Sequence, residues 1–159
     1  LTFFYTKQWE KRLHLFFDNE IKHFTQGYRV KHTEKYLSFF YKEIEIEGYI
    51  DRIDENNGLN IYDYKSGSYT LYTDKTIEKA NDFQLEFYYI LSSYLGDINS
   101  IGFYDLKKGR IVNEELLEEK KILLNNILEQ LGKIETIQIE KTEEKQACVY
   151  CDYKIGRAS

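Results

Sequence analysis

Residues 47–67, with the sequence EGYIDRIDENNGLNIYDYKSG, constrain the fold of this chain more than any other stretch. Two apolar patterns with strand-like alternation flank Asn56-Asn57-Gly58, and this combination predicts a β-hairpin. Asp51 lies near the end of the first pattern, and Asp63 and Lys65 lie at the end of the second. Because side chains two apart on a strand share a face, we expect Asp63 and Lys65 to project together.

The length of the hairpin loop decides which residues face each other across the two strands. A two-residue loop would put Asp51 and Asp63 on opposite faces of the sheet. A three-residue loop, with Gly58 left-handed in a bulge, would pair Glu55 with Leu59 and therefore Asp51 with Asp63. We favour the second register because it brings the two carboxylates together on one face.

Two carboxylates from neighbouring strands are suited to holding a divalent cation, because Mg2+ prefers oxygen ligands and keeps several waters. Alone, an Asp-x-Lys triplet such as Asp63-Tyr64-Lys65 is more typical of a solvated strand edge. The spacing from Asp51 argues against that interpretation. Asp54 points away from Asp51 on a regular strand, so we interpret Asp54 as a salt-bridge or turn residue.

A helix of about residues 80–95 is predicted next along the chain, and Gln84 and Tyr88 share one of its faces because they are four apart. Tyr88 alone would be interpreted as a core residue. The apolar residues expected to be buried on this helix are Phe83, Phe87, Ile90, Leu91 and Tyr94.

The motif GYIDRID…IYDYKSG, followed by QLEFYYI, resembles the RecB family of PD-(D/E)xK nucleases, and most closely the nuclease domain of AddB-type proteins of bacterial double-strand-break repair. The resemblance covers residues 43–95 well. It implies that Asp51, Asp63 and the backbone carbonyl of Tyr64 bind metal, that Lys65 positions the attacking water, and that residues on the helix contact DNA. The helix residues matching the family's Gln-x-x-x-Tyr motif are Gln84 and Tyr88.

The fold implied by the resemblance is α/β and restriction-endonuclease-like, with a central mixed sheet flanked by helices and a single domain over residues 1–159. The implied activity is a DNA exonuclease dependent on Mg2+ or Mn2+, acting in the cytoplasm beside an AddA-like helicase subunit. Two alternatives stay open: a catalytically inactive nuclease-like module for DNA binding or docking, and a RecB-like nuclease of CRISPR adaptation.

Two features depart from the family pattern. Cys148 and Cys151 match cysteines that hold an iron–sulfur cluster in AddB-type domains, but the last cysteine of that pattern is replaced by Arg157 and no upstream cysteine is present. Two thiolates cannot ligate such a cluster, and no second pair completes a zinc site. We therefore expect no cluster and interpret residues 148–157 as a degenerate cysteine staple.

The second departure concerns a metal-binding histidine that the family carries upstream in a Gly-x-x-x-His pattern. His14, His23 and His32 lack that context. Because the chain begins at Leu1 and contains no Met, we expect it to be a fragment, with the histidine helix before Leu1. Glu34 matches an acidic position of the family and is a minor candidate for the site.

The chain shows no run of 18 apolar residues and no signal peptide, so we expect no membrane span. The net charge of the chain is −5, although residues 1–42 carry eight Lys/Arg and four Asp/Glu. A protein that holds duplex DNA on its own surface is usually basic. We therefore expect DNA to be delivered by a partner and to meet a local basic strip. The strip consists of Lys7, Lys11, Arg12, Arg29, Lys31 and Lys35.

The remaining periodicities predict the order of elements. A helix is expected over residues 6–26, extended chain over 28–54, a strand over 59–65, and a strand over about 100–106 that turns at 107–109 and returns through 110–113. A long amphipathic helix is expected over residues 116–131.

Overall fold

The computed structural model describes residues 2–42 and 44–131, and the side chains from residue 6 onward. A five-stranded sheet with the order β1-β2-β3-β4-β5 forms its centre. Only β3 and β4 pair in parallel, and the other neighbours are antiparallel. The elements are α1 (Thr2–Thr25), β1 (Arg29–Tyr41), β2 (Ile44–Glu55), β3 (Leu59–Lys65), the short 3-10 helix η1 (Ile77–Lys79), α2 (Gln84–Ser92), β4 (Ile98–Asp105), β5 (Arg110–Asn113) and α3 (Leu117–Leu131).

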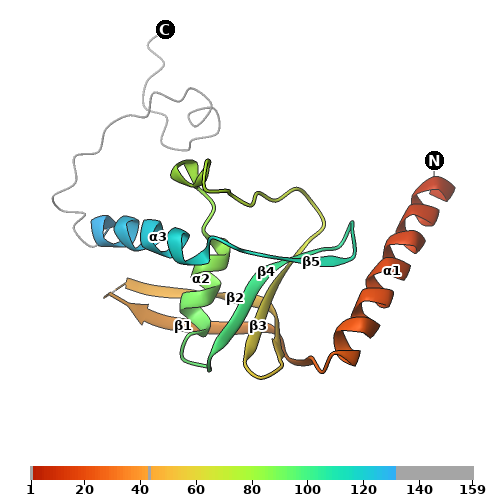
Figure 1. The fold of residues 1–159 in the computed structure, drawn as a ribbon, viewed down its shortest axis with the longest axis horizontal. Helices are drawn as coiled ribbons and strands as arrows, with labels where there is room; N and C mark the ends of the chain where they lie inside the picture. Colours follow the sequence, from red (N-terminus) through yellow and green to blue (C-terminus); the bar gives the residue numbers. More distant parts are fainter. Residues whose placement is uncertain (1, 43, 132–159) are drawn as a thin grey trace, which may run out of the picture.

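Helices cover both faces of this sheet, as Figure 1 shows. The alternation of strand residues assigns each face its helices. On β3, Ile61 belongs to the apolar core that also contains residues of α2 and α3. The next residue, Tyr62, points to the other face, where its ring meets His23 of α1. The predicted mixed sheet flanked by helices is therefore confirmed.

The β2–β3 hairpin has the register that the three-residue loop predicted, with Glu55 opposite Leu59 and Arg52 opposite Tyr62. Gly58 has a positive φ of +137, as expected for the loop, and Asn57 also adopts a left-handed conformation at φ +52. A Cβ on Gly58 would lie 2.6 Å from the side chain of Asn99, which itself donates hydrogen bonds to the carbonyls of Asn56 and Asn57. The loop therefore needs glycine here.

Two element predictions need correction. The extended stretch over residues 28–54 is two antiparallel strands, and its turn is marked by Lys42 at φ +48. The helix predicted over about residues 80–95 begins at Gln84 and ends at Ser92. Tyr94, expected to be buried, is consequently exposed beyond the helix end.

A buried ionic network joins α1 to the sheet. The Arg52 guanidinium donates to both carboxylate oxygens of Asp54 at 2.7 Å and to Glu20 of α1 at 2.8 Å. His23 lies 2.7 Å from Asp54 and stacks on Tyr28. Asp54 is therefore a salt-bridge residue, as predicted, and its partners attach the helix to the strand that carries Asp51.

Candidate active site

Asp63 lies at the centre of the candidate site and is only 3% exposed. Its Oδ1 accepts hydrogen bonds from Gln84 Nε2 at 2.7 Å and from the Tyr88 hydroxyl at 3.2 Å. Its Oδ2 is buried, forms an ion pair with Lys65 Nζ at 2.8 Å, and accepts no hydrogen bond of regular geometry from the described residues. One oxygen of Asp63 is thus held by α2, and the other faces the Lys65 ammonium.

Gln84 connects the two charged residues of β3. Its Oε1 accepts a hydrogen bond of 2.7 Å from Lys65 Nζ, while its Nε2 donates to Asp63 and, at 3.2 Å, lies within hydrogen-bonding reach of the Tyr88 hydroxyl. An amide suits this position because it offers an acceptor to the ammonium and donors to the carboxylate. The two functional side chains of β3 are therefore held in place by the first residue of α2.

Asp51 approaches the same end of β3 from the neighbouring strand. Its Oδ2 accepts a hydrogen bond of 2.8 Å from the backbone N–H of Tyr64. The alternation of β2 changes near Asp51, because Ile50 and Ile53 are three residues apart and both lie in the apolar core. This change of face lets Asp51 point toward β3 although the adjacent Ile50 is fully buried.

Burial and neighbouring charge set the protonation behaviour of the site. Burial raises the pKa of Asp63, the Lys65 ammonium 2.8 Å away opposes that rise, and the nearby Asp51 carboxylate adds to it. Burial also raises the pKa of the Tyr88 phenol, which stays a neutral donor. A carboxylate that is buried and repelled by a second carboxylate is one that a bound cation would stabilise.

The side chains present fit a divalent cation through their chemistry. Asp51 and Asp63 supply hard oxygen ligands, and the buried Oδ2 of Asp63 lacks a regular hydrogen bond. Within residues 2–42 and 44–131, however, no group of three or more His, Cys, Asp or Glu side chains is placed to hold a metal ion. A cation here would keep several waters and bind loosely.

The other sequence candidates are distributed as follows. Glu34 is exposed on β1 at φ +47 and lies between the residues that pair with Ile50 and Arg52 of β2. His23 is structural, because its ring lies 2.7 Å from Asp54 in the buried network under α1. The metal role of the Tyr64 carbonyl and the DNA contacts of Gln84 and Tyr88 stay predictions. Cys148 and Cys151 lie outside the described residues.

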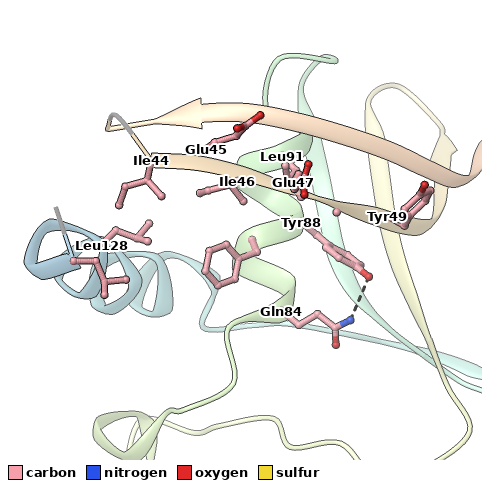
Figure 2. A pocket seen from close by; sticks show the side chains of 12 residues that line it. Ile44, Glu45, Ile46, Glu47, Tyr49, Gln84, Tyr88, Leu91 and Leu128 are labelled. Atoms are coloured by element: carbon pink, nitrogen blue, oxygen red, sulfur yellow. Dashed lines mark hydrogen bonds between the residues drawn. The ribbon is translucent and has the colours of Figure 1, made fainter. Parts of the chain in front are cut away.

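A groove of about 640 Å³ adjoins the site between β2 and the helices α2 and α3. Figure 2 shows Gln84 and Tyr88 at one end of it and Ile44 and Leu128 at the other. The remaining lining is largely apolar, with Glu45 and Glu47 as its charged residues. This side of the site is therefore apolar and acidic.

One buried cluster was missed by sequence reasoning. Lys120 of α3 is 2% exposed and lies 3.0 Å from Glu86 of α2 and 3.1 Å from Glu114. Glu86 sits between Gln84 and Tyr88 on α2, so this ion pair ties the helix that holds Asp63 to α3. Charged residues within an apolar periodicity were the only available signal, and such residues more often face solvent.

The mixed sheet flanked by helices and the two carboxylates beside a lysine fit the nuclease class of proteins. The chain matches the PD-(D/E)XK nuclease superfamily over residues 3–155, which is nearly its whole length, and it belongs to that superfamily. No curated protein and no solved structure matched the chain. No helix in the described part of the chain is both long and apolar enough to cross a membrane.

Proposed function

We propose that this protein is a divalent-metal-dependent deoxyribonuclease, with Mg2+ or Mn2+ as its cation, that degrades DNA from ends as an exonuclease. The observation that carries the proposal is the convergence of Asp51, Asp63 and Lys65 at the end of β3, with Gln84 linking the last two. Membership of the superfamily supports phosphodiester hydrolysis.

In this proposal Asp51 and Asp63 hold the cation, joined by the Tyr64 carbonyl. A bound divalent cation would acidify a water and neutralise charge on the scissile phosphate. Lys65 orients the attacking water and stabilises negative charge on the phosphate as it is attacked. Gln84 keeps the Lys65 ammonium beside Asp63, and Tyr88 fixes the orientation of the Asp63 carboxylate.

The motif GYIDRID…IYDYKSG supports a finer proposal, that the nuclease acts in recombinational repair of double-strand breaks beside an AddA-like helicase in the cytoplasm. The net charge of −5 is consistent with delivery of DNA by such a partner, because an acidic protein attracts DNA weakly over long range.

A second candidate is an inactive nuclease-like module that binds or docks DNA. One observation favours it: in the described part of the chain, the carboxylate pair has no third acidic, histidine or cysteine side chain to complete a metal site. A module that has lost catalysis would keep the fold but not bind the cation.

A cleavage assay on labelled DNA tests the proposal. The protein is incubated with Mg2+ or Mn2+ and with linear or covalently closed circular DNA, and EDTA provides the blank. We expect slow metal-dependent shortening of linear DNA while closed circles stay intact. Cutting of closed circles would contradict exonuclease action, and no cleavage under any condition would favour the inactive module.

A further inference from the structure

A basic groove lies between α1 and the β4–β5 turn, at the carboxyl ends of β3 and β4. It has a volume of about 580 Å³, and among the described residues that line it no carboxylate is present. Five of its lining residues are cationic, in a chain whose net charge is −5. These residues, called the basic groove from here on, are Lys11, Arg12, Lys107, Lys108 and Arg110.

The shape of the groove is fixed by contacts within the fold. Gly109 of the turn adopts φ +59, and a Cβ there would lie 2.8 Å from the backbone of Leu15, so α1 packs directly on the turn. Asp105 fixes the turn by accepting hydrogen bonds of 3.0 Å from the N–H groups of Lys107 and Lys108. Lys108 also lies 3.5 Å from Asp105, which offsets part of its charge. The other four cationic side chains give the groove its positive electrostatic potential.

An apolar pocket of about 340 Å³ adjoins the basic groove and shares Arg12 with it. Trp9 lines this pocket and is 53% exposed, and the Arg12 guanidinium lies 5.2 Å from the centre of its ring. Exposed aromatic rings beside cations are the combination on which single-stranded nucleic acids stack their bases while cations contact the phosphates.

The pocket reaches the candidate active site through the backbone. Tyr64, which lines the pocket, lies between Asp63 and Lys65, and its N–H bonds Asp51. Leu106, also in the lining, donates its N–H to the carbonyl of Lys65 at 2.9 Å. A nucleic-acid strand bound in the groove would therefore have to pass around the ends of β3 and β4 to reach Asp63. The groove on the opposite side carries Glu45 and Glu47, which repel phosphates.

We propose that the basic groove and the Trp9 pocket bind a single-stranded polynucleotide, with phosphates on Lys11 and Lys107 and a base on Trp9. This inference rests on the proposed nuclease function for its biological meaning, but binding itself does not require cleavage. A duplex fits less well because its base faces are covered by stacking, so the Trp9 ring would have no base to meet.

Trp9 is the single tryptophan of the chain, so its fluorescence reports on this site. The test is a titration of the 159-residue chain with oligo-dT in EDTA, which prevents metal-dependent cleavage. We expect quenching of Trp9 fluorescence by oligo-dT, and much less by a duplex of equal length or by polyglutamate. Equal quenching by the duplex would overturn the stacking of a base, and equal quenching by polyglutamate would overturn recognition of a nucleic acid.

Matched charge variants locate the phosphates. Lys11→Ala with Lys107→Ala removes two exposed cations of the groove, and Lys75→Ala with Lys79→Ala removes two exposed cations that do not line it. We expect about tenfold weaker binding for the first pair only. Its plot of log affinity against log salt should be less steep by about 1.4, since each phosphate contact on a single strand contributes about 0.7. Trp9→Ala should also weaken binding about tenfold. Because this variant has lost its fluorescent tryptophan, its affinity is measured by the anisotropy of a labelled oligo-dT.

Unchanged affinity in the Lys11/Lys107 variant, or an equal loss in the Lys75/Lys79 variant, would overturn the groove. Failure of the wild-type chain to bind oligo-dT would overturn it too. Binding that follows these expectations without cleavage in Mg2+ would support the groove and contradict the nuclease proposal. Cleavage in Mg2+ together with unaltered oligo-dT affinity in the Lys11/Lys107 variant would support the nuclease proposal and contradict the groove.

Discussion

The side-chain amide of Gln84 donates a hydrogen bond of 2.7 Å to the carboxylate of Asp63, across 21 positions of sequence. Since the same amide accepts from Lys65, the geometry of the candidate site depends on where α2 begins. Positioning of this kind affects catalysis more than folding, because misplacing reacting groups by about 1 Å can cost on the order of 100-fold in rate.

Gln84→Ala should therefore reduce metal-dependent DNA cleavage by about tenfold or more while the chain stays folded. The amide is only partly buried, so its removal leaves no large cavity. Initial cleavage rates and the far-UV circular dichroism spectrum provide the two measurements. Gln26→Ala, the same substitution at an exposed position, is the control and should retain the wild-type rate. A wild-type rate in Gln84→Ala would show that the bridge has no role in catalysis.

Arg52→Met should destabilise the fold by about 3–5 kcal/mol, because it leaves the buried Asp54 carboxylate without its main cation. Urea unfolding of the variant and the wild type measures the difference. Arg29→Met, at an exposed arginine bonded to two backbone carbonyls, should cost no more than about 1 kcal/mol. A loss below about 1 kcal/mol in Arg52→Met would mean that the network under α1 contributes little stability.

Gly58→Ala should cost about 1–3 kcal/mol, because φ +137 is strained for alanine and the new methyl group would displace the Asn99 side chain. Gly67→Ala is the matched control, since a Cβ there meets no atom within 4 Å. Thermal unfolding of both variants should therefore separate them clearly. Equal melting temperatures would contradict the loop geometry that sets the register of β2 and β3, with Glu55 opposite Leu59.

The stability of the chain should respond to pH through Glu86. Burial raises the pKa of this carboxyl above its usual value, and Lys120 only partly opposes the rise. A raised folded-state pKa means that the contribution of Glu86 to stability is fully present below its unfolded pKa and is lost as pH rises through the folded pKa.

Glu86→Gln removes this dependence, because glutamine does not ionise. Relative to the wild type, the variant should gain unfolding free energy as the pH rises from about 4.5 toward neutrality, the direction that follows from the raised pKa. Urea unfolding at several pH values gives the difference curve. A difference that falls over this range would mean that the Lys120 ion pair outweighs burial and that the direction of the shift is wrong.

The sequence predicted the β2–β3 register because two local signals agree, the loop Asn56-Asn57-Gly58 and the period-two alternation that follows it. It did not predict the β1–β2 turn, because the chain there offers no Gly, Pro, Asn or Asp and Lys42 itself adopts the left-handed conformation. Sequence spacing likewise placed Gln84 and Tyr88 on one helix face. Their bonds to Asp63 depend on tertiary packing, which periodicity does not contain.

The buried polar residues of α1 were also beyond sequence reasoning. Glu20 and His23 occur in an amphipathic pattern where charged residues are normally solvated, yet both are buried against Arg52 and Asp54. The pairing of Arg52 with Asp54 two positions later on the same strand face gives a local signal. The identity of the helix residues that complete the network requires the fold.

The central claim is that Asp51 and Asp63 together hold a divalent cation, and calorimetric titration with Mn2+ tests it most directly. The wild type should bind one ion weakly, with Asp63→Ala showing no such binding and no loss of fold, and the exposed control Asp74→Ala matching the wild type. Absence of binding in the wild type, or unchanged binding in Asp63→Ala, would contradict the site and favour an inactive nuclease-like module.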